Sequence, residues 1–331
     1  MKIDIHHHFI PRAYMDRAEA LVPPGVVVAR EGAIATFADS KTGFVYLRVD
    51  PQYWCDPMTQ LANMDAAGVD HAILSPACYQ DWMTLEAAQI INDGTAEVVA
   101  RYPDRFSGMI SVPPDGDKAM VAEIRRARGL GLCALNITTI HQGRFPDHPD
   151  FRLLLEVAAE LDLPVFVHPS WRCSNCENLG QWNLERSVGI PGDLNLCVAR
   201  VLFSGILDDL PGLRFIFPHL GGSLPMTFRR LFLNQGGPLV NVPDRDYPEL
   251  LKRVYFDTAP GIWQSPLEIE FGVRSFGSSQ VMLGSDYPLS HDPDNLLCRS
   301  VQHVADATLP DSDKQRIFSA NAIELFRLAR T

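Results

Sequence analysis

The sequence lacks long hydrophobic runs: no apolar segment approaches the roughly 18–20 residues that a membrane span requires. It also lacks an excess of positive charge, since 29 Lys and Arg face 40 Asp and Glu among 331 residues, for a formal net charge of −11. A negative balance of this size disfavours nucleic acid or an anionic membrane as the main partner. The first residues contain no hydrophobic leader, so no secretory signal is expected.

Cysteine is too sparse for a disulfide framework, with seven residues in a chain of this length. We therefore expect reduced cysteines in a cytoplasmic protein. Cys173 and Cys176 have the C-x-x-C spacing, but no second pair completes a zinc knuckle. A structural role is favoured for this pair, with a redox pair or an incidental metal site as alternatives.

Short apolar runs alternate with longer amphipathic stretches along the chain. The runs have no polar/apolar alternation, which is typical of strands buried on both faces of a parallel sheet. Eight of them are predicted to be strands: Lys2–His6, His71–Pro76, Ser107–Val112, Leu132–Thr138, Pro164–His168, Leu213–Pro218, Arg253–Asp257 and Gln280–Gly284. Helical patterns lie between most of these runs.

Eight strands with helical crossovers predict an α/β protein with a (β/α)8 TIM barrel. A doubly wound open sheet is the alternative. The first strand is not followed by G-x-G-x-x-G, which weakens a dinucleotide-binding version of that alternative. The chain 1–331 is expected to form a single domain, with an insertion at about 12–56 that separates the first two strands.

The insertion contains three short β-like segments, at Val26–Arg30, Ile34–Phe37 and Phe44–Val49. We interpret them as a small β flap inserted after strand one, on the side of the barrel where active sites form. A second irregular stretch, Ser170–Pro191, follows the fifth strand and is also expected to overhang the barrel mouth.

Histidines and one aspartate stand where several of the predicted strands end. His6 and His8 are two residues apart on one strand, so their rings point the same way. His168, His219 and Asp286 follow three other apolar runs. Because the carboxyl ends of barrel strands gather at one rim, these five side chains are expected to converge. Three imidazoles and a carboxylate suit Zn²⁺ or a similar divalent ion, with a position left for water.

Several segments together resemble the amidohydrolase superfamily. They are IDIHHHFIP, PVFVHPSW, LRFIFPHLGGSLP and MLGSDYP, supported by YPDRFSGMISVP. Within the superfamily they are most similar to aminocarboxymuconate-semialdehyde decarboxylase and related metal-dependent decarboxylases. The resemblance implies metal ligation by four residues, His6, His8, His168 and Asp286, with His219 as an acid/base beside them. It also implies one metal ion rather than two, because Asn136 stands where two-metal relatives carry a carboxylated lysine.

The expected chemistry follows from a bound cation, which lowers the pKa of its water to about 7. His219 within hydrogen-bond reach could take a proton from that water, and Asp286 could orient it or deliver a proton to carbon. Zn²⁺ is the expected metal, although this set of ligands also tolerates Mn²⁺.

A small carboxylate substrate also requires a cationic partner, and arginine matches a carboxylate at two points. The resemblance places Arg48 and Arg230 in this role and sets Trp182 over the pocket. It further implies that the arginine matching Arg230 enters the neighbouring subunit's site, and therefore a homodimer. For each of the three residues, a structural or surface role is the alternative.

The resemblance favours nonoxidative decarboxylation of a small unsaturated or aromatic carboxylic acid. A hydrolase acting on a lactone or amide, or a hydratase, would use the same metal-bound water and the same residues. A non-enzymatic metal-binding scaffold is a further alternative, and it predicts no open coordination position.

Overall fold

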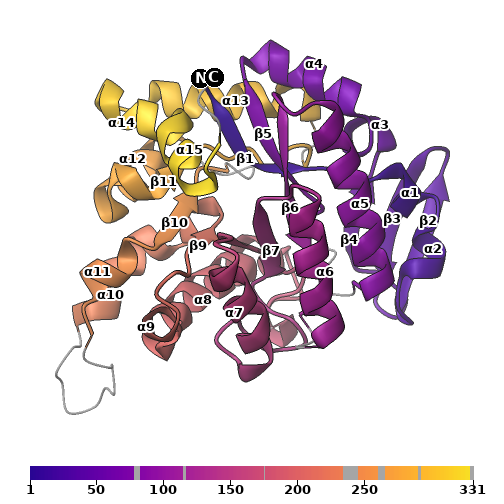
Figure 1. Ribbon diagram of the computed structural model, residues 1–331, viewed down its shortest axis with the longest axis horizontal. Coiled ribbons are helices and arrows are strands. Elements are labelled where there is room, and N and C mark those ends of the chain that lie inside the picture. The colour runs from indigo at the N-terminus through magenta and orange to yellow at the C-terminus, as the bar shows by residue number, and fades with distance from the viewer. Residues whose placement is uncertain are drawn as a thin grey trace.

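Eight parallel strands form a nearly closed barrel in the computed structural model, which describes residues 1–77, 83–114, 117–174, 176–233, 245–259, 265–289 and 292–328. Their order around the barrel follows the sequence (Figure 1). The strands are β1 (Ile3–His8), β5 (His71–Ser75), β6 (Phe106–Ser111), β7 (Ala134–Thr138), β8 (Val165–His168), β9 (Phe215–Phe217), β10 (Val254–Asp257) and β11 (Val281–Met282). The predicted (β/α)8 barrel is therefore confirmed.

The barrel closes where β1 meets the chain that follows β11. The backbone N–H of Ile5 donates to the carbonyl of Leu283 at 3.0 Å, and that of Asp286 donates to His6 at 2.8 Å. The strand β1 extends two residues beyond its predicted end, because His8 still pairs with Ser75 of β5. This closure sets Asp286 beside the histidines of β1.

Helices surround the barrel (Figure 1). The longer ones are α4 (Pro57–Ala67), α5 (Leu85–Arg101), α6 (Lys118–Gly129), α7 (Arg152–Glu160), α8 (Ile190–Ser204), α10 (Leu224–Leu233), α12 (Pro266–Phe276) and α13 (Pro293–Asp306). The shorter ones are α1 (Arg12–Met15), α2 (Ala18–Leu21), α3 (Pro51–Trp54), α9 (Ile206–Asp209), α11 (Tyr247–Leu251), α14 (Asp311–Gln315) and α15 (Asn321–Phe326). No helix in the described part of the chain is both long and apolar enough to cross a membrane.

Local sequence explains where these helices begin and end. In α4, the Asp56 carboxylate accepts from the backbone N–H groups of Met58 and Thr59, and Pro57 occupies the first turn. The helix ends at Gly68, whose φ of 64° is a left-handed conformation that glycine adopts without a steric penalty. The adjacent strand β5 can therefore start three residues later.

A three-stranded antiparallel sheet lies between β1 and β5 in the sequence: β2 (Val26–Glu31), β3 (Ile34–Asp39) and β4 (Val45–Val49). It appears at the edge of the barrel beside α1 and α2 (Figure 1). Phe37 and Leu47 of this sheet share a buried hydrophobic cluster with Trp171, which follows β8. Burial of these side chains joins the sheet to the loop after β8. That the whole chain is one domain with an insertion remains a prediction.

Candidate metal centre

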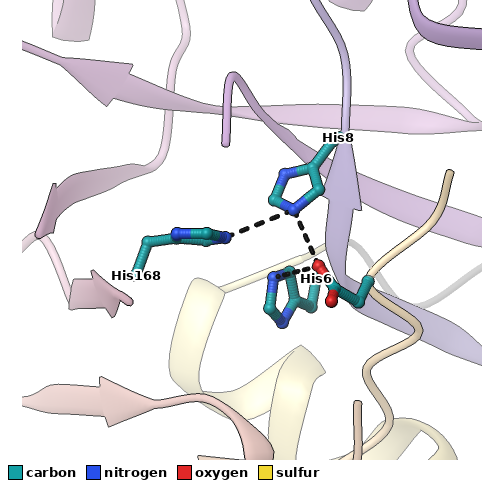
Figure 2. A group of neighbouring side chains, drawn as sticks. His6, His8 and His168 are labelled. Atoms are coloured by element: carbon teal, nitrogen blue, oxygen red, sulfur yellow. Dashed lines mark hydrogen bonds and ion pairs between the residues drawn. The ribbon is translucent and has the colours of Figure 1, made fainter. Parts of the chain in front are cut away.

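Four predicted ligands converge at one end of the barrel strands. His6 and His8 come from β1, His168 ends β8, and Asp286 follows β11. All four are buried, and one potential ligand atom of each lies within 4.8 Å of the others. In Figure 2 the ring of His168 points at that of His8, with His6 below them. The arrangement brings together side chains from three parts of the sequence.

Short distances connect the members of this cluster. Nε2 of His8 lies 2.9 Å from Asp286 Oδ1 and 3.3 Å from Nε2 of His168. Nε2 of His6 lies 3.2 Å from the same Asp286 oxygen. His7 points elsewhere: its Nδ1 lies 2.9 Å from Asp4 Oδ2, and its ring stacks on Tyr287. The alternation of β1 therefore separates His7 from the two candidate ligands.

Each imidazole is held at the ring nitrogen that faces away from the cluster. His6 Nδ1 donates to the Asp257 carboxylate at 2.9 Å, and His168 Nδ1 donates to the Pro169 carbonyl at 2.9 Å. His8 Nδ1 lies 3.1 Å from the Ser75 hydroxyl. Such contacts fix the ring orientation and leave Nε2 as the electron-pair donor for a metal.

The cluster fits a single divalent cation. Three imidazole nitrogens and one carboxylate oxygen are the donors that Zn²⁺ and Mn²⁺ accept. His6 Nε2 is buried, and its 3.2 Å contact with Asp286 Oδ1 does not have the geometry of a hydrogen bond. A buried polar atom without a partner is costly, and a cation would satisfy it. Asn136, in the middle of β7, is buried and is not part of the cluster.

The charges of the site shift its pKa values. Burial alone would lower the pKa of His6, but the carboxylates of Asp257 and Asp286 outweigh it and raise the pKa to about 10. Burial lowers the pKa of His8, and it holds that of His168 well below the ordinary value. Burial would raise the pKa of Asp286, but the positive charge of His6 and the close contacts with His6 and His8 hold it well below its usual range. The carboxylate is therefore ionised and available to a cation.

His219 lies beside the cluster rather than within it. It follows β9, and its Nε2 lies 4.0 Å from Asp286 Oδ2. Its Nδ1 donates to the Ala259 carbonyl at 3.1 Å, and its backbone N–H donates to Asp257 Oδ1 at 2.9 Å. The φ angles of His219 and Asp286 are 53° and 61°, an unusual left-handed conformation outside glycine. Non-glycine residues held in this conformation concentrate at functional sites.

The cluster borders a large cavity of about 1260 Å³. His168, His219 and Asp286 line it together with apolar side chains from the loops and helices around the barrel mouth. Those apolar side chains include Val45, Leu47, Trp54, Trp171, Ile190, Leu194, Leu220, Met226, Phe271 and Leu289. A mostly apolar hollow with a few convergent polar groups is typical of a small-molecule site.

The three predicted substrate-binding residues are placed differently. Arg48, on β4, lines the cavity. Trp182 is 84% exposed, and Arg230 is exposed on α10. Neither of these two is among the residues that line the cavity within this chain. Cys173 is buried in the loop that follows β8.

Sequence reasoning missed two residues of this site. Asp257 was predicted only as the end of a strand, although a lone acid that ends a buried apolar strand is the same signal that identified Asp286. Arg186 lines the cavity from the loop after β8. It had no comparable signal, because no periodic pattern surrounds it.

An α/β barrel with a His₃Asp cluster at the carboxyl ends of its strands defines a class of metal-dependent barrel proteins. The family model described as amidohydrolase matches residues 3–328, and the chain belongs to this family. The predicted membership is therefore confirmed.

Among curated relatives, the 2-amino-3-carboxymuconate-6-semialdehyde decarboxylase of Dictyostelium discoideum is 28% identical over 340 residues, which cover 99% of this chain and 92% of the relative. The 5-carboxyvanillate decarboxylase of Sphingomonas paucimobilis has a similar structure, with a TM-score of 0.82 and 21% identity over 99% of both chains. A variant of the Novosphingobium aromaticivorans enzyme of that name has a TM-score of 0.79 and 25% identity, over 99% of this chain and 97% of its own. That structure holds manganese and 3-methoxy-4-hydroxy-5-nitrobenzoic acid.

Proposed function

We propose that this protein is a metal-dependent nonoxidative decarboxylase of a small aromatic or unsaturated carboxylic acid. The observation that carries the proposal is the buried cluster of His6, His8, His168 and Asp286 beside a largely apolar cavity. Relatives named as decarboxylases match the chain along nearly its whole length, which supports a carboxy-lyase.

In the proposed reaction, the bond between the carboxylate carbon and its neighbour breaks and CO₂ leaves. The bonding electron pair stays on the neighbouring carbon, which then takes a proton. A divalent cation in the cluster would withdraw negative charge from the substrate as that electron pair develops. The chain itself must then position the acid and supply the proton.

Asp286 and His219 are the proposed proton-handling groups. Both line the cavity, and His219 Nε2 lies 4.0 Å from Asp286 Oδ2. Because Nδ1 of His219 donates to the Ala259 carbonyl, Nε2 is the nitrogen that exchanges a proton with Asp286 or with the substrate. The surrounding apolar side chains keep water away from the substrate carbon that accepts the proton.

One ion per chain is proposed, with Zn²⁺ as the expected metal and Mn²⁺ as the alternative. The three imidazoles suit Zn²⁺, and the manganese in the Novosphingobium aromaticivorans structure supports the alternative. Elemental analysis of the purified protein tests both the identity and the number of ions.

Arg48 is proposed to bind the acid, since it lines the cavity. A homodimer is proposed as well, with Arg230 reaching the site of the second copy. Supporting this, α10 and the neighbouring α12 expose the apolar side chains of Met226 (73%) and Leu267 (69%). The exposed Trp182 would gain cover in such a dimer.

The dimer is tested by light scattering and by mixing inactive variants. If Arg230 acts in the second copy, Arg230→Gln subunits mixed with Asp286→Asn subunits regain activity, because one site of the mixed dimer is intact. A monomeric protein, or no gain on mixing, contradicts this proposal.

A cytoplasmic location is also proposed, supported by the thiols of Cys55, Cys133, Cys197 and Cys298. Cell fractionation tests it.

The decarboxylase assignment is tested by incubating metal-loaded protein with hydroxybenzoates, aminocarboxymuconate-type semialdehydes and pyrone carboxylates. Release of CO₂, with loss of its mass from the acid, is the expected result. Hydrolysis of lactones or amides, or hydration, without CO₂ release would contradict the assignment.

A further inference from the structure

Two inserted segments meet beside the cavity: the strand β4 and the loop that follows β8. Arg186, in the π-helical turn Glu185–Gly189 of that loop, donates through Nη2 to the carbonyl of Val45 at 3.0 Å. Its guanidinium also lies 5.4 Å from the ring centroid of Trp171. Stacking on the aromatic ring and the bond to β4 hold this exposed arginine in place.

A β-bulge gives Arg48 its direction. Leu47 pairs with Phe37, whereas Val45 pairs with Ala38, so Tyr46 is an extra residue in β4. Without the bulge, Val45 and Arg48 would point to opposite faces of the strand. With it, both are exposed and both line the cavity, while the intervening side chains are buried. The side chains of Val45 and Arg48 therefore share the exposed face of β4, and Arg186 is bonded to the backbone of this strand at Val45.

The two guanidinium groups have unused hydrogen-bond donors. Two arginines, Arg48 and Arg186, and no lysine line the cavity in the described part of the chain. The Arg48 side chain makes no hydrogen bond or ion pair with any described residue, and the Arg186 side chain uses one donor on Val45. Since each guanidinium carries five N–H groups, both can bind an anion without losing a protein contact.

The acidic residues of the cavity wall lie on other elements. Glu268 belongs to α12, and Asp292 and Asp294 stand at the start of α13. Asp50 follows β4, but its carboxylate caps α3 by accepting from the Gln52 N–H at 3.0 Å. The positive charge of the cavity wall is therefore concentrated between β4 and the β8 loop.

We propose that Arg48 and Arg186 form an anion subsite for a second acidic group of the substrate, distinct from the carboxylate that is removed. This inference rests on the proposed function for its substrate: an aromatic or unsaturated acid with two anionic groups. Arg186 acts by direct contact with the second group, and Trp171 positions its guanidinium. The carboxylate that leaves would lie at the cluster of histidines, and the second anion at the subsite.

The test compares binding of two probes, isophthalate with two carboxylates and benzoate with one, to metal-loaded protein by titration calorimetry. We expect Arg186→Gln to weaken isophthalate binding about tenfold or more and benzoate binding less than twofold. Arg186→Lys should restore part of the isophthalate affinity, because charge is kept but the two-point geometry is lost. Arg48→Gln should show the same selectivity for the diacid.

Arg172→Gln is the matched control. Arg172 lies in the same loop and also contacts the flap: it is 3.9 Å from Asp39 and over the Phe44 ring, but it does not line the cavity. Its loss should leave the ratio of the two affinities unchanged. The proposal would be overturned if Arg186→Gln lost affinity for both probes equally, or if Arg172→Gln lost affinity for isophthalate alone. Either result would show that Arg186 only holds the sheet β2–β4 in position.

The binding measurement is independent of turnover, so the two proposals can fail separately. Selective diacid binding without CO₂ release from any acid would leave the subsite standing and refute the decarboxylase. Decarboxylation of monoacids by a protein that binds isophthalate no better than benzoate would refute the subsite alone.

Discussion

The metal centre and the cavity mouth are built in opposite ways. At the metal centre, His6, His8 and His168 are buried, and each has a second contact that fixes its ring. At the mouth, Arg48 and Arg186 are exposed and lie on inserted segments outside the barrel strands. The rigid strands therefore hold the groups for the reaction, and the insertions hold those that select the acid. Substitutions should be most severe at the centre and mildest at the mouth.

The largest effect is expected from removing two ligands at once, in the variant His6→Ala/His8→Ala. Loss of two of four donors should reduce the bound metal from about one ion per chain to near zero and abolish CO₂ release. Metal content is measured by elemental analysis and folding by circular dichroism. His148→Ala, a half-exposed histidine outside the cluster, should keep its metal. A folded double variant that retains one ion per chain would show that the cluster is not the site.

A slightly smaller effect is expected for His219→Asn, because His219 lies beside the cluster and is not one of the four candidate ligands. The variant should bind metal as the parent does, while kcat falls by about 10²–10⁴, the usual range for loss of a general acid or base. Steady-state kinetics and metal analysis on the same preparation separate the two effects. Retained turnover would mean that another group moves the proton, and lost metal would make His219 a ligand.

The parts of this site that the sequence predicted share one physical origin. Apolar runs that end in a histidine or an aspartate identify strands and their carboxyl ends, and barrel geometry then requires those ends to meet. Five side chains are brought to one rim in this way: His6, His8, His168, His219 and Asp286. The resemblance to the amidohydrolase superfamily, and not the strand pattern, then separates His219 from the four predicted ligands. The barrel itself was predicted from the same runs, because strands buried on both faces have no alternation.

The other residues of the site could not be predicted from the sequence, because their roles depend on tertiary contacts that a single sequence does not show. The role of Asp257, at the end of β10, depends on its reaching both the His6 ring of β1 and the backbone of His219, which follows the neighbouring strand β9. The direction of Arg48 depends on a one-residue bulge. The position of Arg186 depends on the path of the loop that follows β8, which brings this residue to β4. These features are set by tertiary packing rather than by periodicity.

The variant Asp257→Asn sharpens the comparison of the metal centre with the cavity mouth, because it disturbs the metal centre without removing one of the four candidate ligands. The amide keeps the size of the carboxylate but loses its charge, so His6 is held less firmly. Metal affinity should fall by about 10–100-fold, as for other partners of metal-bound histidine. The dissociation constant is measured by competition with a chromophoric chelator.

Asp193→Asn provides the control for Asp257→Asn. Asp193 is also buried and accepts two hydrogen bonds from Ser174, but it lies on α8, outside the metal cluster. This variant is expected to lose stability and keep its metal affinity. Equal metal affinity in the two variants would remove Asp257 from the account of the centre.

The smallest effect concerns protons released when the metal binds. His6 has a pKa of about 10 in the metal-free protein and is therefore protonated at pH 7, whereas burial lowers the pKa values of His8 and His168 and leaves them neutral. Asp286 is already ionised. A cation requires neutral imidazole, so its binding should release roughly one proton, from His6, and affinity should rise as the pH rises toward 10.

Calorimetric titration of the metal in two buffers of different ionisation enthalpy measures the released proton directly. Asp257→Asn removes one of the two carboxylates that hold the proton on His6, so its metal binding should release a smaller fraction of a proton at pH 7. A binding heat that does not depend on the buffer would mean that His6 is neutral before the metal arrives. In that case the carboxylates around His6 would serve to orient its ring and would not hold a charge that the metal replaces.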